Sequence, residues 1–255
     1  MITFTKKSRM PISDKFTSIL SKNFEINFMQ CTPNGKLKIT ELCNLLQLTA
    51  AEHSEIGGIS YIDMQVFNQA WVLSRMRLEI VDLPKWKDTI TVKTWICSLE
   101  NSRSIRAIEV YVNDKKMVGA ETFWAVFNTK TRRPEALQLP HEHFEKFKDN
   151  RATTAEVSKI TVLENLEFVH SKKVYLSDLD MVNHVNNIKY LEWCLDLLDE
   201  KLILSNKIMS IDLNYLKELS ISDEIIIETK KVDKTIFFEI KKESKSVFLL
   251  KINTL

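Results

Sequence analysis

The most informative segment reads Asp180-Met181-Val182-Asn183-His184-Val185-Asn186-Asn187, in the second half of a 255-residue chain. It leads into an apolar stretch near Ile188 that predicts a helix. A similar arrangement precedes a helix in the first half, where Thr32-Pro33-Asn34-Gly35-Lys36-Leu37 begins 148 positions earlier. A repeated order of elements indicates a duplicated fold.

Each half reads as one helix with several strands. In the first half, apolar residues recur at helical spacing from Thr40 to Glu55 and stop before the Gly57-Gly58 pair. Runs rich in β-branched and aromatic residues predict the later strands, at 70–80, 89–97, 103–112 and 117–128. The second half predicts a strand at 166–176, a helix at 188–202, and strands at 208–216, 224–230, 235–241 and 246–252.

The two halves share a second anchor, because Leu78–Asp88 matches Leu213–Asp223 at an offset of 135 positions. The stretch from Pro134 to Lys159 is charged and poor in large apolar residues, and predicts a loop and helix between the halves. We therefore expect an N-terminal domain at residues 1–148 and a C-terminal domain at 149–255.

Bulk composition excludes several classes of protein. The net charge is only +2, with 36 basic and 34 acidic residues mixed along the chain, so no nucleic-acid partner is indicated. The four cysteines form no CxxC pair, which predicts reduced, mostly buried thiols and no metal cluster. Only four glycines occur, which argues against a Gly-rich phosphate loop. No signal peptide or long apolar run is present, so we expect a cytoplasmic protein without membrane insertion.

Titratable residues distinguish the two copies. At the positions of Asp180 and His184 the first half has Thr32 and Lys36, and opposite Glu218 it has Leu83. Histidine titrates near neutral pH, and a carboxylate can orient it or take a proton from water. If Asp180, His184 and Glu218 converge, the chain has one hydrolytic site, in its second half.

The same residues also have a purely structural interpretation. Asp180 and the asparagines after it are typical turn or N-cap residues, and His184 could be an ordinary, partly buried histidine. Glu218 could be a solvated charge between a strand and a turn. Spacing alone leaves both interpretations open.

The segment Ser177–Trp193 closely resembles the active-site segment of plant and bacterial acyl-acyl carrier protein thioesterases. The resemblance runs from about Phe24 to Ile252. Four further stretches resemble the family's N-terminal half in the same order: 33–37 (PNGKL), 70–75 (AWVLSR), 84–88 (PKWKD) and 131–134 (TRRP).

This resemblance implies an α+β fold of two tandem hotdog domains, each a long helix wrapped by an antiparallel β-sheet. It also implies hydrolysis of the thioester that joins a fatty acyl chain to acyl carrier protein, with no metal or cofactor. Carried over by position, Asp180, His184 and Glu218 match the family's catalytic Asp, His and Glu.

Two positions depart from the family pattern. The family usually has Asn two residues after the Asp, whereas this chain has Val182 there and an Asn one later, at Asn183. The residue after the Glu, often Cys in the plant enzymes, is Leu219, which excludes a cysteine nucleophile at that position. Asn183 and Asn187 are candidate supporting residues.

The expected mechanism has Glu218 or His184 activate water, while Asp180 positions the set or attacks directly. A backbone N–H at the start of the Ile188 helix would polarise the thioester carbonyl. The resemblance places the acyl chain in the N-terminal domain, with Leu46, Ala50 and Trp71 as candidate lining residues, although such residues would pack a core in any case.

Acyl carrier protein is acidic, so the surface of this chain that binds it should be basic. The candidates are Arg132, Arg133, Lys172, Lys173, Lys189 and Lys217. Two other functions stay open: a thioesterase that acts on acyl-CoA, and a non-catalytic acyl-binding hotdog protein, which Val182 makes more plausible. A homodimer is a further expectation.

Overall fold

The computed structural model describes residues 12–255, and its strands form one antiparallel sheet. The helices are α1 (Ile39–Ile56), α2 (Tyr61–Gln65), α3 (Asn187–Leu195) and α4 (Glu200–Leu204). The strands are β1 (Ile19–Glu25), β2 (Gln69–Ile80), β3 (Thr89–Glu100), β4 (Arg103–Val112), β5 (Lys115–Asn128), β6 (Arg133–Pro134), β7 (Glu167–Lys173), β8 (Ile208–Tyr215), β9 (Glu224–Val232), β10 (Thr235–Lys242) and β11 (Lys245–Thr254).

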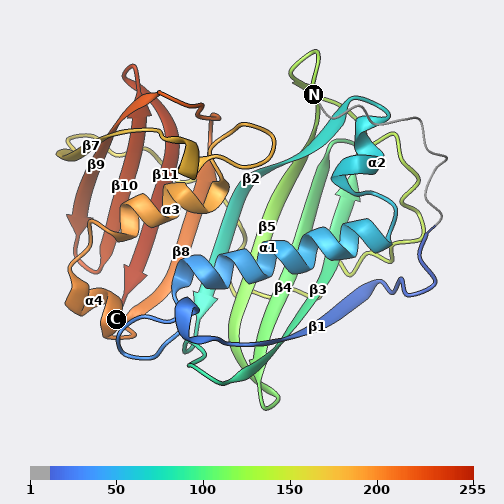
Figure 1. Ribbon diagram of the computed structural model, residues 1–255, viewed down its shortest axis with the longest axis horizontal. Helices are drawn as coiled ribbons and strands as arrows, with labels where there is room; N and C mark the ends of the chain where they lie inside the picture. The colour runs from blue at the N-terminus through green and yellow to red at the C-terminus, as the bar shows by residue number, and fades with distance from the viewer. Residues whose placement is uncertain (1–11) are drawn as a thin grey trace.

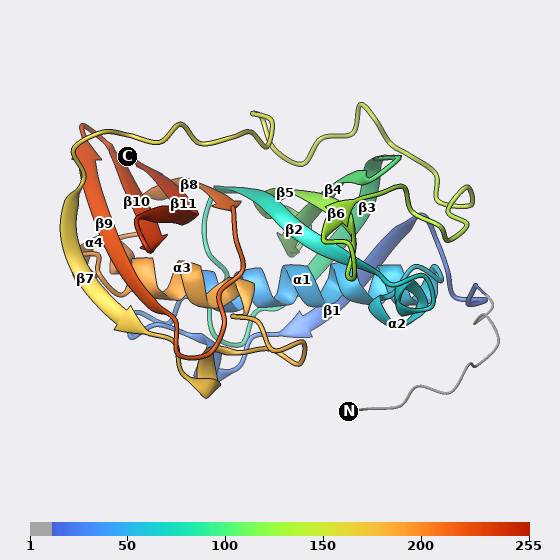
Figure 2. The same cartoon turned by 90° about the horizontal axis from the view of Figure 1, so that it is seen from above.

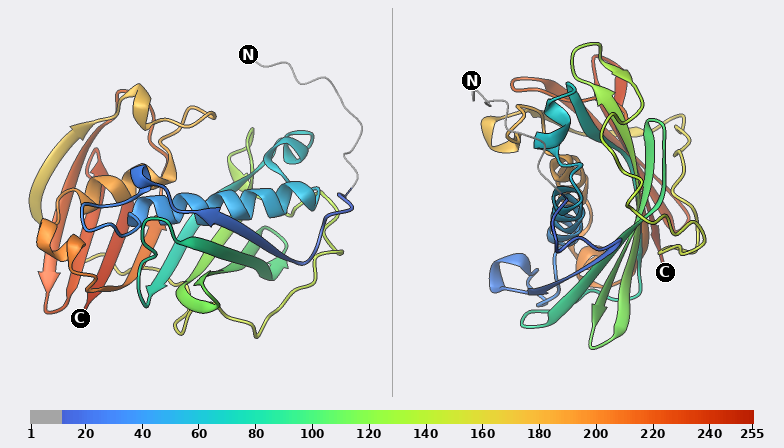
Figure 3. Two further views of the ribbon diagram at one scale, coloured as in Figure 1. Left: turned by 60° about the horizontal axis from the view of Figure 1, so that its bottom comes forward. Right: turned by 90° about the vertical axis from the view of Figure 1, so that its right-hand side faces the viewer.

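The second half repeats the strand order of the first half in reverse across the sheet. The order runs β1-β3-β4-β5-β2 and then β8-β11-β10-β9-β7, with β2 and β8 paired at the junction and β6 paired to β5. The sheet curves around α1 and α3, which lie on its concave side (Figures 1 and 3). This arrangement is the predicted α+β double hotdog.

Helix α1 is amphipathic and turns its apolar stripe toward the sheet. The buried side chains recur at intervals of three and four residues, at Leu42, Leu45, Leu46, Thr49, Ala50 and His53. Strands β2 and β8 contribute Met76, Leu78, Ile211 and Leu213 to the same core, which is continuous across the junction of the halves. The core therefore binds the two copies into one body.

Backbone hydrogen bonds confirm the duplication at the level of single residues. Thr32 N donates to Lys36 O at 2.8 Å, as Asp180 N does to His184 O at 2.8 Å. Leu37 N donates to Pro84 O at 2.7 Å, and Val185 N to Leu219 O at 2.9 Å. These pairs reproduce the offsets of 148 and 135 read from the sequence.

Several predicted elements differ from the structure. The helix predicted at 188–202 is two short helices, because Asp199 caps a new helix through Lys201 N at 2.7 Å. The linker predicted as a loop and helix has no helix in the structure described for 135–166. The predicted strand at 166–176 ends at Lys173, and sequence patterns missed β1, α2 and β6.

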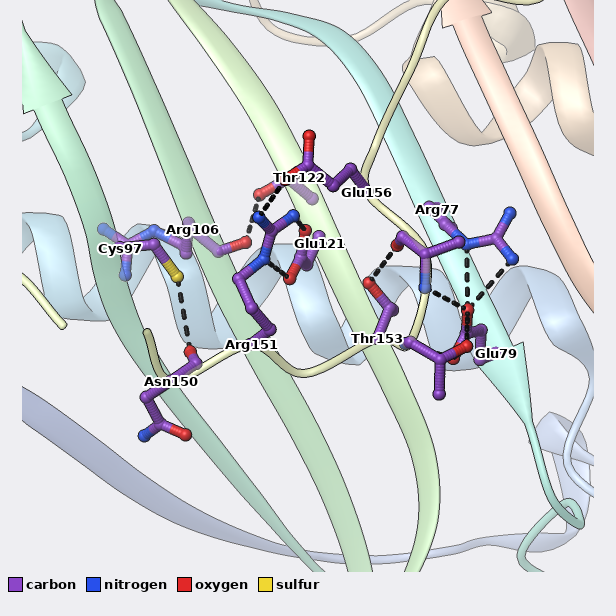
Figure 4. Close-up of polar contacts among 12 residues, drawn as sticks. Arg77, Glu79, Cys97, Arg106, Glu121, Thr122, Asn150, Arg151, Thr153 and Glu156 are labelled. Carbon is purple, nitrogen blue, oxygen red and sulfur yellow. Dashed lines mark hydrogen bonds and ion pairs between the residues drawn. The ribbon is translucent and has the colours of Figure 1, made fainter. Parts of the chain in front are cut away.

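The linker between the halves crosses the convex face of the sheet (Figure 2). Arg151 pairs with the buried Glu121 of β5 (Figure 4). Thr154 N donates to Glu79 of β2 at 2.7 Å. Farther on, Ile160 N donates to Asn214 Oδ1 of β8 at 2.8 Å. The linker is therefore a strap that fastens both halves. The predicted domain boundary at 148/149 falls within it and stays a prediction.

Candidate active site

Asp180 begins a tight loop before α3. Its Oδ1 accepts hydrogen bonds from Val182 N at 3.0 Å and from His184 N at 3.3 Å, and its carbonyl accepts one from Asn183 N at 3.1 Å. This is the turn geometry that an aspartate favours. One carboxylate oxygen thus shapes the backbone that presents His184.

Asn183 occupies the position of Gly35 in the first copy. Both residues are left-handed, with φ of 66° for Asn183 and 77° for Gly35, and asparagine tolerates this region better than other side chains. Asn183 is exposed, and its side chain makes no hydrogen bond within residues 12–255. Asn183 therefore contributes to the backbone geometry of the turn. The neighbouring Val182 is 37% exposed.

Glu218 lies in the turn after β8, which two hydrogen bonds tie to the Asp180 loop and to α3. Leu219 O accepts from Val185 N at 2.9 Å, and Leu219 N donates to the Tyr190 hydroxyl at 3.0 Å. Burial, with the nearby Glu218 carboxylate, raises the pKa of Tyr190, so this phenol stays protonated. Sequence reasoning missed Tyr190, although it belongs to the quoted motif.

The His184 and Glu218 side chains lie next to each other in the structure. His184 Nε2 lies 3.5 Å from Glu218 Oε2, and both side chains are about one-third exposed, at 35% and 33%. The spacing exceeds an ordinary N–H···O hydrogen bond. Asp180 reaches His184 only at its backbone N–H, and no hydrogen bond or ion pair joins the Asp180 carboxylate to the His184 ring or to the Glu218 carboxylate within residues 12–255.

Arg132 reaches the site from the N-terminal half. It lies in the turn between β5 and β6, and its guanidinium forms an ion pair with Glu218 Oε2, the oxygen that faces His184. The Arg132 side chain is 58% exposed. The sequence suggested Arg132 only as a docking residue. No local pattern showed that it contacts Glu218.

The matching place in the first half holds a different pair. Lys36, which corresponds to His184, donates to both carboxylate oxygens of Asp82 at 2.8 and 2.9 Å and to Leu83 O at 3.1 Å. Asn206 Nδ2 of the second half also donates to Asp82 at 3.2 Å. This first-copy site is thus a structural ion pair between lysine and aspartate, with no imidazole.

The N-terminus of α3 offers fewer free donors than expected. Ile188 N donates to the Asn186 side chain at 2.9 Å and Lys189 N to the Asn186 carbonyl at 2.9 Å, so the predicted donor near Ile188 is engaged. Asn187 N makes no hydrogen bond within residues 12–255. Asn187 O accepts from the Tyr215 hydroxyl at 3.1 Å.

The candidate lining residues lie in two places. Leu46 and Ala50 are buried on α1 against the sheet, in the core shared by the halves. Trp71 is half-buried in a separate cluster near α2, where its Nε1 donates to Ile59 O at 3.0 Å. Two surface hollows lie elsewhere: Ser98 and Phe123 are among the residues that line one, and Ile80 and Ile208 are among those that line the other. Neither hollow is lined by Leu46, Ala50 or Trp71.

Some of the candidate docking cations are already engaged. Lys172 stacks over Trp193 at 5.2 Å and lies 3.6 Å from Asp178, and Lys189 pairs with Glu192 at 2.9 Å. By contrast, Arg133, Lys173 and Lys217 are exposed and form no ion pair within residues 12–255. Arg133 directly follows Arg132 in the chain, and Lys217 directly precedes Glu218.

Comparison with known proteins gives the family. The description "Acyl-ACP thioesterase N-terminal domain" matches residues 17–146, and "Acyl-ACP thioesterase C-terminal domain" matches residues 163–253. The chain belongs to the acyl-ACP thioesterase family. The two matched parts fall on the two copies of the hotdog fold, and the catalytic candidates lie in the second.

Individual relatives of the acyl-ACP thioesterase family agree. The chain is 29% identical over 217 residues to a chloroplastic palmitoyl-acyl carrier protein thioesterase of Gossypium hirsutum, covering 78% of this chain and 52% of that protein. It is 25% identical to a chloroplastic oleoyl-acyl carrier protein thioesterase of Coriandrum sativum, covering 75% and 57%. The chain thus spans about half the length of the curated relatives it matches.

Solved structures extend the match to the whole fold. An acyl-ACP thioesterase from Bacteroides thetaiotaomicron superposes with a TM-score of 0.86 at 27% identity, covering 93% of this chain and 98% of that one. The 12:0-ACP thioesterase from Umbellularia californica gives a TM-score of 0.81 at 20% identity, covering 93% and 97%. The second likeness supports the fold alone.

Two further observations concern the described residues. No helix within 12–255 has the length and apolar character needed to cross a membrane. The four cysteines are free thiols, three of them buried, as the sequence predicted.

Proposed function

We propose that the protein hydrolyses the thioester between a fatty acyl chain and acyl carrier protein, releasing the free fatty acid and the carrier thiol. One observation carries the proposal: His184 and Glu218 meet in one copy of the fold only, whereas the other copy places Lys36 and Leu83 at these positions. Family membership supplies the substrate class.

The pair can act as a general base. Water that lies against His184 and Glu218 would lose a proton to the pair as its oxygen attacks the thioester carbon. The C–S bond then breaks, and the same proton passes to the departing sulfur. Arg132 would hold Glu218 toward His184, because its guanidinium binds the oxygen that faces the imidazole.

Asp180 supports the site through the loop. One of its oxygens holds the backbone before His184, and the other makes no hydrogen bond within residues 12–255, so it is available to water or to the thioester. The N–H of Asn187 is the free donor nearest the start of α3, and we assign to it the stabilisation of the carbonyl oxygen. Neither role requires the missing Asn at Val182.

The acyl chain would occupy the N-terminal half, with Leu46, Ala50 and Trp71 among its lining residues. Acyl carrier protein would dock beside the Arg132–Glu218 pair, where the exposed Arg133 and Lys217 offer positive charge to an acidic partner. A homodimer stays a prediction.

The test is to incubate purified protein with acyl carrier protein that bears a fatty acyl thioester, and to measure free fatty acid and free thiol together. Equal release of both, lost in the His184→Ala variant, supports the proposal. Intact thioester after prolonged incubation would show a binding protein instead. Faster release from the same acyl group on CoA would favour the acyl-CoA alternative.

A further inference from the structure

A polar layer divides the interior of the N-terminal half. The core that both halves share reaches Ala50, Ile108 and Ala120, and a separate apolar cluster near α2 begins at Ile96 and Val126. Between these two clusters, four neighbouring elements each carry a buried polar residue. The layer consists of His53 on α1, Thr94 on β3, Arg106 on β4 and Thr122 on β5.

Arg106 is the charged member of this layer, and it is only 4% exposed. Its Nη1 donates to His53 Nδ1 at 2.7 Å and to Thr94 Oγ1 at 3.3 Å, and its Nη2 to Ser54 Oγ at 3.4 Å. No carboxylate lies within ion-pair distance of Arg106 in the structure of residues 12–255. The guanidinium is therefore hydrogen-bonded but not neutralised.

His53 does not supply the missing negative charge, and it does not share the positive one. Its Nε2 donates to Thr17 O at 2.9 Å, while its Nδ1 accepts from Arg106. Burial, reinforced by the neighbouring Arg106 cation, lowers the pKa of His53 to about 3, so the ring is neutral. Burial lowers the pKa of Arg106 to about 10, which leaves it charged at neutral pH.

The C-terminal half shows that the fold does not require this polarity. The tight turns at Asn113-Asp114 and Glu243-Ser244 correspond, since all four residues have positive φ. Counting from these turns, Arg106 and its cross-strand partner Thr122 match Ile236 and Ile252, which are also cross-strand partners. Both isoleucines are buried in a continuous apolar core.

Thr94 provides the check on this correspondence. Its hydroxyl donates to Ala107 O at 3.0 Å, and Thr229 donates to Phe237 O at 2.9 Å at the matching place. The threonine is thus present in both copies, whereas the arginine occurs in one. Burying an ion without an opposite charge destabilises the folded state, so a role in binding is the natural reason for its presence.

The layer lies along the strand that leads away from the proposed active site. Strand β5 ends at Asn128, just before the turn that carries Arg132, and its concave-side residues run back through Val126 and Trp124 to Thr122. From Asn128 to Thr122 the strand covers about 20 Å. Trp124 Nε1 donates to Thr122 Oγ1 at 2.9 Å, next to Arg106.

We propose that the polar layer is the distal end of the acyl-binding site, and that Arg106 sets the longest acyl chain that the protein accepts. An alkyl chain that reached Arg106 would have to remove hydrogen-bond partners from a buried cation. This inference rests on the proposed function, because it assigns a chain-length limit to the same reaction.

The experiment compares wild-type protein with Arg106→Met, whose side chain has similar length and no charge. The kcat/KM is measured on acyl carrier protein substrates with saturated chains of increasing length. We expect the ratio of long-chain to short-chain kcat/KM to rise by about tenfold or more in Arg106→Met, a typical scale for changes in an apolar pocket. Arg106→Lys keeps the charge and should keep the wild-type ratio.

Ile236→Met is the matched control, because it alters the corresponding position of the other half. It should leave the chain-length ratio unchanged. If Arg106→Met folds poorly, as judged by its melting temperature, Thr122→Ile gives a second way to make the layer apolar, and it should shift the ratio in the same direction. An equal loss of turnover at every chain length would show that Arg106 only supports the fold, and would overturn the inference.

Direct binding separates this inference from the proposed reaction. Calorimetry with free fatty acids of increasing length should show that Arg106→Met gains affinity for long chains relative to wild type. Absence of hydrolysis in wild type, together with this gain, would refute the proposed reaction and keep the inference. If wild type hydrolyses the thioester but Arg106→Met and Thr122→Ile both keep the wild-type chain-length profile, the proposed reaction stands and the inference about Arg106 is overturned.

Discussion

His184 Nε2 and Glu218 Oε2 lie 3.5 Å apart, brought together by a loop before α3 and a turn after β8. The two segments are held in place by the hydrogen bonds of Leu219 to Val185 and Tyr190. Because neither partner is fully buried, each can be replaced with little effect on packing.

The first prediction concerns Glu218. Glu218→Gln keeps the shape of the side chain and removes its charge, so we expect kcat to fall by about 100-fold or more, a typical contribution of a general base. Steady-state release of fatty acid measures the effect. Glu224→Gln, at an exposed position on β9, serves as a control and should behave as wild type.

The second prediction separates the two roles of Asp180. Asp180→Asn retains an oxygen that can accept the hydrogen bonds of Val182 N and His184 N, so the loop and the melting temperature should be preserved. We expect kcat to fall at least about tenfold, because the carboxylate charge is lost. Full activity in this variant would show that Asp180 only shapes the loop.

The third prediction tests Arg132 as a positioning residue. Arg132→Met removes the ion pair with Glu218, and we expect kcat to fall by about tenfold on a small thioester as well as on the carrier-protein substrate. Exposed ion pairs stabilise proteins by less than about 1 kcal/mol, so the melting temperature should hardly change. Arg133→Met should instead raise KM for the carrier-protein substrate alone, and an identical effect of both variants would argue against positioning.

The fourth prediction concerns Tyr190, which is almost fully buried. Tyr190→Phe leaves the Leu219 N–H without its acceptor, which should reduce the free energy of unfolding by about 1–3 kcal/mol. Loosening the turn should also lower kcat through Glu218. Denaturant titration and kinetics measure the two effects, with the exposed Tyr175→Phe as the control.

The fifth prediction is a pH dependence of stability that arises from His53. Its pKa is about 3 in the folded protein against 6.5 for a free histidine, so the unfolded state binds more protons between these values. Stability should therefore fall as pH drops from about 6.5 toward 3, by an amount on the order of several kcal/mol. His53→Gln should be less stable at neutral pH but show a shallower decline, while the exposed His170→Gln should decline as wild type does.

Sequence patterns alone predicted the repeated order of elements, the long helix α1, most strand positions and the asymmetry of the titratable residues. These features are local, because helical and strand periodicity, turn residues and a short motif are written in neighbouring positions. The same reasoning identified His184 and Glu218 through the missing counterparts at Lys36 and Leu83.

The remaining features depend on contacts between segments that are far apart in the chain. Three such features are the Arg132–Glu218 pair, the strap across the convex face and the buried Arg106 layer. They depend on which strands become neighbours, because pairing across a sheet joins residues that lie far apart in the sequence. The break between α3 and α4 also appeared only in the structure, since Asp199 caps a new helix where the apolar pattern continues. The motif thus supplied the candidate catalytic groups, while long-range contacts determined which residues surround them.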